Sequence, residues 1–143
     1  MPWIQLQPYL LFHGQCREAF EFYCGVLHGD IETMMTHRES PAAGQVPADW
    51  QDTIIHATLR VGDAVLMASD APPQYQEKMS GFSVSLQIPD LEEGRRIFGA
   101  LSEGGTVTMP FDRTFWSDGF GMCIDRFGVP WMVNYVPVGQ KAT

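Results

Sequence analysis

The sequence has little positive charge, and no long apolar run. Only 9 Lys and Arg stand against 17 Asp and Glu in 143 residues, so the net charge is −8 at pH 7. We therefore expect no nucleic acid and no membrane partner, because nucleic acids and anionic membrane surfaces attract basic proteins. No stretch approaches the roughly 18 apolar residues of a transmembrane helix. The first residues carry no basic charge, so we expect no signal peptide.

Cysteine is also scarce, and the usual cofactor motifs are missing. Cys16, Cys24 and Cys123 are an odd set without a Cys-x-x-Cys pair, which favours a reducing, cytoplasmic location. Cys16 and Cys24 fall eight residues apart on a predicted helix, roughly 12 Å along its axis, too far for a disulfide. Gly-x-Gly-x-x-Gly, P-loop and Gly-x-Ser-x-Gly patterns are absent from the sequence, so we expect no bound cofactor.

The first half of the sequence contains a set of short predicted strands and one predicted amphipathic helix. Apolar residues from Cys16 to Leu27 recur at helical spacing, and Gly29 is predicted to end the helix. Residues 38–52 hold proline and few apolar anchors, which is typical of a surface loop. His37 and Glu39, at its start, are interpreted as an exposed pair rather than metal ligands. The predicted strands are Ile4–Phe12, Ile31–Thr36, Thr53–Val61 and Ala64–Ala68.

The second half repeats this order. Asp90 is the predicted N-cap of a helix that ends at Gly104-Gly105. Phe22 and Ile97 occupy matching helix positions, about 75 residues apart, which indicates an internal repeat. Two unrelated α+β halves are the alternative that this pattern leaves open. The predicted strands are Phe82–Ile88, Thr106–Met109 (ended by Pro110), Phe120–Ile124 and Val129–Tyr135.

The predicted fold class is therefore α+β, with two tandem βαβββ modules forming a cupped mixed sheet. The modules span residues 4–70 and 80–136, and a proline-containing linker covers residues 70–81. In each module the helix covers one face of the sheet, and the other face is left open. Paired modules can curve these open faces into a cleft.

Several motifs carry a resemblance to a known family. They are GG-VTMP, TFW-D-FGM and D-FGV-WM-N within residues 104–134, together with Pro8-Tyr9-Leu10 and the segment from Val61 to Asp70. The sequence resembles the PhnB-like branch of the vicinal oxygen chelate superfamily, which includes glyoxalase, bleomycin-resistance and dioxygenase relatives. The resemblance implies a glyoxalase-like fold and a homodimer. It leaves the function open, because the superfamily hosts many chemistries.

The resemblance also implies where a divalent metal would bind. Its four ligand positions fall at Pro8, Met67, Ser83 and Met132. Proline has no side-chain donor, serine is a weak ligand, and methionine is a soft one. We therefore expect no bound metal.

Strand alternation indicates the residues that line the predicted cleft. Val84, Leu86 and Ile88 should face the helix, whereas Ser83, Ser85 and Gln87 face the cavity. Ile55, Ala57 and Leu59 form one face of their strand and leave His56 on the other, where it would be the group that titrates near neutral pH. Loop aromatics are expected to form a lid over the ligand. The predicted ligand-binding residues are Met67, Ser83, Ser85, Gln87, Trp116, Phe120, Met132 and Asn134, and Phe115 is a further lid residue.

Three hypotheses for the function follow from these residues. The first is a metal-free protein that binds a small-molecule ligand. The second is an enzyme of the same fold, of lyase, isomerase or dioxygenase type, with His56 as a catalytic base or with a metal at a site placed elsewhere. The third is a structural or partner-binding homodimer without a cleft ligand.

Overall fold

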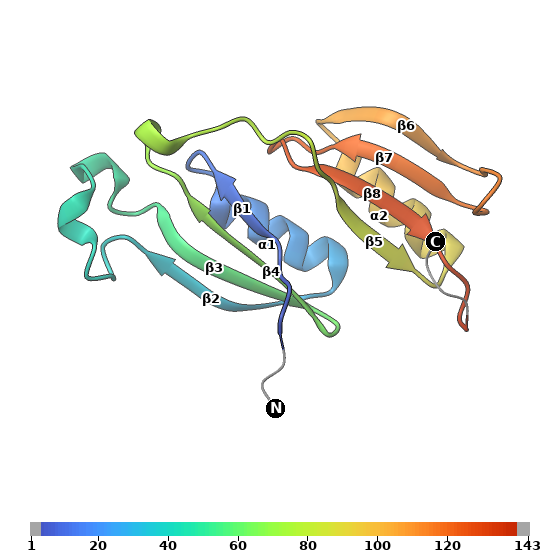
Figure 1. Cartoon of the computed structure of the whole chain (residues 1–143), viewed down its shortest axis with the longest axis horizontal. Helices are drawn as coiled ribbons and strands as arrows, with labels where there is room; N and C mark the ends of the chain where they lie inside the picture. Colours follow the sequence, from blue (N-terminus) through green and yellow to red (C-terminus); the bar gives the residue numbers. More distant parts are fainter. Residues whose placement is uncertain (1–3, 140–143) are drawn as a thin grey trace. The chain divides into compact units, whose positions relative to one another are not determined.

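The computed structural model describes residues 4–139, and its chain divides into two compact units (Figure 1). The first unit is Met1–Glu77 and the second is Lys78–Thr143. The division falls inside the 70–81 segment that the composition marks as a linker. Within residues 4–139, no helix has the length and apolar character needed to cross a membrane.

The first unit is a four-stranded mixed sheet with one helix. Its strand order is β1-β4-β3-β2, with β1 parallel to β4 and the other neighbours antiparallel. The helix packs against one face of this sheet (Figure 1). The elements are β1 (Tyr9–Phe12), α1 (Cys16–Leu27), β2 (Asp30–Thr36), β3 (Ile54–Val61) and β4 (Ala64–Asp70).

Helix α1 buries the predicted apolar stripe, but it ends one residue earlier than expected. His28, not Gly29, takes the left-handed conformation, with φ of 55°. Gly29 is required for another reason. A Cβ atom at this position would lie 2.7 Å from the carbonyl oxygen of Arg60, so the close approach of β2 to β3 excludes a side chain.

The buried carboxylate of Asp70 fixes the start of α1. The helix has no side-chain cap from Gln15. Instead, Asp70 Oδ1 accepts hydrogen bonds from the backbone N–H groups of Gly14 (2.9 Å) and Cys16 (3.0 Å). Asp70 Oδ2 accepts from Ile54 N–H at 2.8 Å. One carboxylate at the end of β4 therefore holds together the helix start and the first residue of β3.

The second unit repeats the first, which confirms the predicted α+β fold of two βαβββ modules. The strand order is β5-β8-β7-β6, with β5 parallel to β8. Asp90 caps α2 as expected, because its carboxylate accepts a hydrogen bond from Glu93 N–H at 2.8 Å. The elements are β5 (Val84–Ile88), α2 (Leu91–Ser102), β6 (Thr106–Asp112), β7 (Phe120–Ile124) and β8 (Pro130–Tyr135).

A second buried carboxylate, Asp125, fixes the turn between β7 and β8. Its Oδ1 accepts from the N–H groups of Phe127 and Val129, each at 2.9 Å. Its Oδ2 accepts from the indole N–H of Trp131 at 2.8 Å. Trp131 is buried in the core of this unit, so Asp125 joins the turn to the core.

Three predicted strand details were wrong. Strand β6 continues through Pro110, which is tolerated because β6 is an edge strand and needs no proline N–H in the ladder. Strand β1 begins at Tyr9 rather than Ile4. In β3 the buried residue is Ile54, not Ile55, because the pairing with β2 shifts between Met35 and Thr36.

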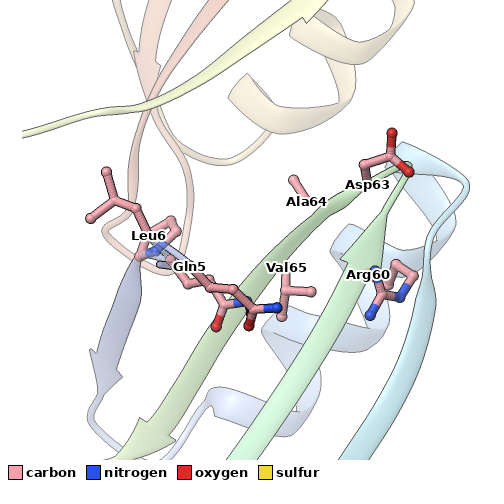
Figure 2. A pocket seen from close by; sticks show the side chains of 8 residues that line it. Gln5, Leu6, Arg60, Asp63, Ala64 and Val65 are labelled. Carbon is pink, nitrogen blue, oxygen red and sulfur yellow. Dashed lines mark hydrogen bonds between the residues drawn. The ribbon is translucent and has the colours of Figure 1, made fainter. Parts of the chain in front are cut away.

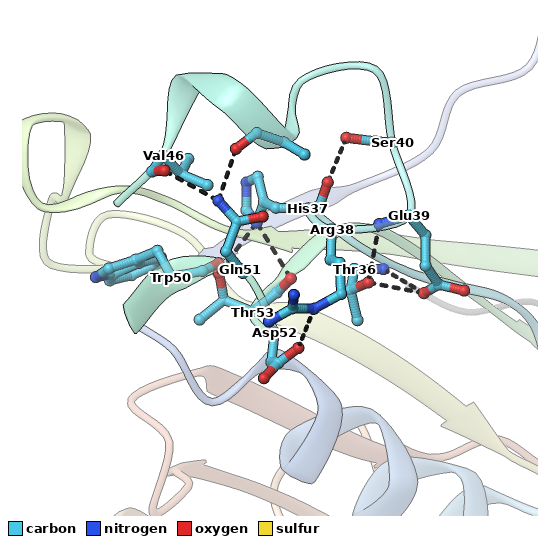
Figure 3. Close-up of polar contacts among 11 residues, drawn as sticks. Thr36, His37, Arg38, Glu39, Ser40, Val46, Trp50, Gln51, Asp52 and Thr53 are labelled. Carbon is cyan, nitrogen blue, oxygen red and sulfur yellow. Dashed lines mark hydrogen bonds and ion pairs between the residues drawn. The ribbon is translucent and has the colours of Figure 1, made fainter. Parts of the chain in front are cut away.

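The 38–52 segment has more internal structure than a plain surface loop (Figure 3). It contains two short 3₁₀ turns, Ala43–Gln45 and Ala48–Trp50. The side-chain amide of Gln51 donates to the carbonyl oxygens of Ala43 (2.6 Å) and Val46 (3.0 Å). These bonds close the segment on itself.

Of His37 and Glu39, at the start of this segment, Glu39 is exposed as expected and His37 is not. His37 is buried, and its Nδ1 lies 3.1 Å from the carbonyl oxygen of Thr53. The Glu39 carboxylate accepts hydrogen bonds from the N–H and the hydroxyl of Thr36, and these bonds lower the pKa of Glu39. Both side chains therefore order the chain locally.

Candidate functional site

In each unit, the strand residues that point away from the helix form what we call the open face. On the second open face, the register places Ser85 beside Met132, Met132 beside Met122, and Met122 beside Met109. Directly opposed residues of neighbouring strands lie ~4.5–5.5 Å apart at Cα. Three thioether side chains therefore form a row across β8, β7 and β6. Methionine is flexible and polarisable, so such a row adapts to the shape of an apolar ligand.

The next row on the second open face is polar and then aromatic. Gln87 pairs with Asn134, Asn134 pairs with Phe120, and Phe120 pairs with Asp112 at the β6 edge. The Asn134 amide donates to Gln87 Oε1 at 3.0 Å, and the Gln87 amide donates to Ser85 Oγ at 2.8 Å. Asn134 is only 6% exposed. Within the described chain, its Oδ1 atom is buried and has no hydrogen-bond partner.

Aromatic side chains extend the second open face into the loop before β7. The Trp116 ring meets the Phe120 ring edge to face, with centroids 5.3 Å apart. Phe115 contacts Trp116 but is 98% exposed. The structure therefore joins Trp116 and Phe120 to this face, whereas Phe115 extends into solvent beside Trp116.

The first open face has different chemistry. The register joins Tyr9 to Met67 and Met67 to Thr58. Half-buried His56 lies on the same face of β3 as Thr58, as predicted from alternation. The hydroxyl of Tyr9 lies 3.3 Å from His56 Nδ1, and the two rings stack with centroids 5.8 Å apart.

A pocket of about 290 Å³ opens at the β3–β4 hairpin end of the first unit (Figure 2). The guanidinium of Arg60 lies in it but donates to Glu32 at 2.9 Å, and this hydrogen bond raises the pKa of Arg60. Asp63 adds a further negative charge nearby. The pocket is therefore poorly suited to anions. Its lining residues are Gln5, Leu6, Gln7, Pro8, Arg60, Asp63, Ala64 and Val65.

Two cysteines, Cys16 in the first core and Cys123 in the second, are buried. Burial raises the pKa of Cys123 to about 11, and the charge of Asp125 adds to the effect. Burial, followed by the charge of Asp70, also raises the pKa of Cys16. Since the thiolate is the nucleophile, neither side chain is suited to covalent catalysis.

The structure divides the predicted site residues between the two units. His56 and Met67 belong to the first open face, and Ser83 lies immediately before β5. The remaining predicted residues come together on the second open face: Ser85, Gln87, Trp116, Phe120, Met132 and Asn134.

Sequence reasoning missed three residues of these faces. Met122 follows Phe120 with the period of a strand, and this signal was available. Met109 was hidden because the β6–β7 pairing shifts on both sides of it. Tyr9 contacts His56 only because β4 brings β1 and β3 to the same sheet, which is a tertiary effect.

The residues present do not fit the superfamily's divalent metal. Among residues 4–139, no three His, Cys, Asp or Glu side chains are placed so that they could hold a metal ion. The four expected ligand positions carry Pro8, Met67, Ser83 and Met132, which lack the nitrogen and carboxylate donors that zinc, magnesium or manganese need. The absence of a metal remains a prediction for elemental analysis.

Comparisons with known proteins agree with this architecture. A family described as 3-demethylubiquinone-9 3-methyltransferase matches residues 4–134. Protein YjdN of Escherichia coli K12 is 37% identical over 139 residues, which cover 92% of this chain and 95% of YjdN.

Two solved structures are also similar. Protein PA1353 of Pseudomonas aeruginosa is 49% identical with a TM-score of 0.87, and the match covers 94% of this chain and 99% of that one. A PhnB protein of Bacillus cereus is 23% identical with a TM-score of 0.77, over 93% and 100% of the two chains. At that identity the likeness to the Bacillus protein concerns the fold alone.

Proposed function

We propose that this chain, which belongs to the family described as 3-demethylubiquinone-9 3-methyltransferase, binds a small, mainly apolar molecule. The PhnB-like members of this family have the vicinal oxygen chelate fold. The proposed site is the second open face. The observation that carries the proposal is the row of Met109, Met122 and Met132 beside the buried amide of Asn134. A broad apolar lining with a few placed polar groups is typical of small-molecule sites.

The chemistry of this face selects against strongly anionic ligands. Its central polar side chains, Ser85, Gln87 and Asn134, are neutral, and the carboxylate of Asp112 lies opposite Phe120 at the β6 edge. A phosphate or dicarboxylate would lose its hydration without gaining a charged partner, which is costly. Aromatic ligands suit the site, because methionine sulfur and the rings of Trp116 and Phe120 contact aromatic surfaces favourably.

Methyl transfer, which the family description names, is not part of this proposal. The connection from β1 to α1 is His13-Gly14-Gln15, and that from β5 to α2 is Pro89-Asp90. Neither has the glycine-rich strand-to-helix turn that nucleotide-type cofactors use. The residues present at these turns therefore do not fit S-adenosylmethionine.

Tryptophan emission tests the proposed site. We expect hits from a neutral aromatic ligand screen to quench emission, and Trp116→Phe to remove most of the quenching. Trp50→Phe is the matched control, because Trp50 lies in the 38–52 segment of the first unit. Hits that do not change Trp116 emission, and that still bind after Asn134→Ala, would place the ligand site elsewhere. A screen without hits would favour the partner-binding homodimer.

A second candidate function, catalysis, rests on the Tyr9–His56 contact. A histidine whose Nδ1 lies 3.3 Å from a tyrosine hydroxyl is held in a defined orientation, as a general base requires. If the protein is an enzyme, mass spectrometry of hits incubated with it will show their conversion to product. His56→Ala should then abolish the conversion while the hits still bind. Unchanged hits in both proteins would leave binding alone as the function.

We also propose a homodimer as the assembly of the chain. Strand β6 is an edge strand, and its Val107 and Met109 are 47% and 39% exposed. Exposed strand edges with apolar side chains are usually covered in proteins. Sedimentation equilibrium at micromolar concentration should give twice the chain mass of 16.0 kDa, whereas monomer mass alone would contradict the proposal.

A further inference from the structure

Asn134 carries an unused hydrogen-bond acceptor inside the proposed ligand site. The residue lies in the middle of the second open face, between Gln87 on β5 and Phe120 on β7. The residue is only 6% exposed, and its Oδ1 is buried and has no partner within the described chain. A buried carbonyl without a partner destabilises a protein, so its presence requires a reason.

The direction of the neighbouring hydrogen bonds sets which amide atom is left unpaired. In the structure Asn134 donates to Gln87 Oε1, and Gln87 in turn donates to Ser85 Oγ, so an acceptor remains at the Asn134 end. In the reversed chain, with the Ser85 hydroxyl donating to Gln87 and Gln87 donating to Asn134, the N–H of Asn134 would be left unpaired instead. The two directions make opposite predictions, because an unpaired acceptor favours a ligand donor and an unpaired N–H favours a ligand acceptor.

The surroundings of this acceptor limit what can satisfy it. The neighbours of Asn134 on the open face are Phe120, directly opposite on β7, and Met132, two residues earlier on β8. Neither side chain is a donor that could pair with a carbonyl. Within the described chain no side chain supplies this donor, so it comes from a water molecule or from a bound ligand that displaces the water. The same apolar neighbours disfavour a charged donor, because its charge would be desolvated beside them and Phe120 separates Asn134 from the carboxylate of Asp112.

We infer that Asn134 Oδ1 is the specificity anchor of the site, accepting a hydrogen bond from the O–H or N–H of a neutral aromatic ligand. The inference rests on the proposed function and narrows its ligand class to phenols, anilides and similar donors. Such a site rejects the analogue that lacks the donor, because the carbonyl then remains buried and unpaired.

The sequence allows a direct measurement at this atom. Asn134 is the only asparagine among the 143 residues, so selective ¹³C,¹⁵N-asparagine labelling yields a single side-chain signal. The probes are phenol and anisole, in which a methyl group replaces the donor hydrogen of phenol. We expect phenol to shift the Asn134 ¹³Cγ resonance downfield and to bind at least tenfold more tightly than anisole. This experiment uses the unmodified chain and depends on no variant.

The variant Asn134→Leu supplies the second arm. We expect it to bind both probes with affinities within twofold of each other, and to unfold at a temperature no lower than the unmodified protein. A purely structural asparagine would instead lower the unfolding temperature and leave the probe ratio unchanged. Phe115→Leu is the control, because Phe115 is 98% exposed and should not change the ratio.

The possible outcomes distinguish a failure of the Asn134 anchor from a failure of the proposed ligand site. Equal binding of phenol and anisole, with Met122 and Met132 resonances shifted and ¹³Cγ of Asn134 unmoved, overturns the anchor and keeps the proposed function. Preference for anisole also overturns it. Binding of neither probe, with no shift at Met122 or Met132 up to the solubility limit, overturns both.

Discussion

The two open faces share one topology but differ in their chemistry. The first carries groups that can hold or move a proton, Tyr9 and His56, together with the paired cation Arg60. The second has neutral side chains in the row of Met109, Met122 and Met132 and at Gln87 and Asn134, and a carboxylate, Asp112, opposite Phe120 at its β6 edge. The repeated fold therefore sets where residues lie, and the individual side chains decide what each face can do.

The glycines and buried carboxylates that fix the backbone of each unit show the same contrast, a shared arrangement with different side-chain roles. Gly29 and Gly105 stand at equivalent positions before β2 and β6, and at both an added Cβ would meet a partner-strand carbonyl, at 2.7 and 2.1 Å. The buried carboxylates differ. Asp70 joins strand β4 to a helix start, whereas Asp125 closes a turn. The close backbone contact is thus the same in both units, whereas the role of the buried carboxylate differs between them.

The largest expected effect is the loss of Asp70. Asp70→Ala removes the acceptor of three backbone N–H groups, on Gly14, Cys16 and Ile54. We expect the free energy of unfolding to fall by about 3–5 kcal/mol, since each unpaired buried donor costs about 1–3 kcal/mol. Urea unfolding followed by circular dichroism measures it. The control Asp52→Ala removes an exposed pair with Arg38 and should change stability by less than about 1 kcal/mol. Equal losses in both variants would refute the anchoring role.

The next effect concerns the strand approach in the second unit. Gly105→Ala would place a Cβ 2.1 Å from the carbonyl oxygen of Ile124, so β6 must move and we expect a loss of about 2–3 kcal/mol. Gly99→Ala in α2 is the matched control, because nothing lies within 4 Å of its added Cβ. That change should stabilise by about 0.5–1 kcal/mol. Similar unfolding midpoints for the two variants would contradict the close approach.

A smaller effect appears at high pH. Burial raises the pKa of the Cys123 thiol from 9.0 to about 11 in the folded chain. Between these values the folded protein keeps a proton that the unfolded chain has lost, so stability falls as pH rises, by at most about 1.4 kcal/mol per pH unit. Cys123→Ala should make the decline between pH 9 and 11 shallower. An unchanged slope would show that Cys123 does not contribute.

Much of the fold was predictable, because the hydrophobic periods are local. The helix stripe from Cys16 to Leu27 and the alternation of Val84, Leu86 and Ile88 follow from spacing alone. The 75-residue offset between Phe22 and Ile97 then indicated the repeat.

The details that escaped prediction depend on contacts between distant segments. Asp70 caps a helix that begins 54 residues earlier, which no local pattern indicates. Pro110 fits inside β6 only because that strand is an edge. His28 adopts the left-handed conformation although a glycine follows it.

The candidate site was predictable only in part, for the same reason. Period-two alternation put Ser85, Gln87, Met132 and Asn134 on one face. It could not show that the amide of Asn134 is buried with one atom unpaired, because that depends on cross-strand neighbours.

The central claim is that the second open face, rather than the first, receives the ligand. Methionine methyl NMR tests it most directly, because ¹³C-methyl labelling reports on both faces in one spectrum. Met122 and Met132 mark the second face, and Met35 and Met67 mark the first. On titration with a hit from the aromatic screen, we predict saturable shifts at Met122 and Met132 that exceed those at Met35 and Met67. Shifts confined to Met35 and Met67 would contradict the account.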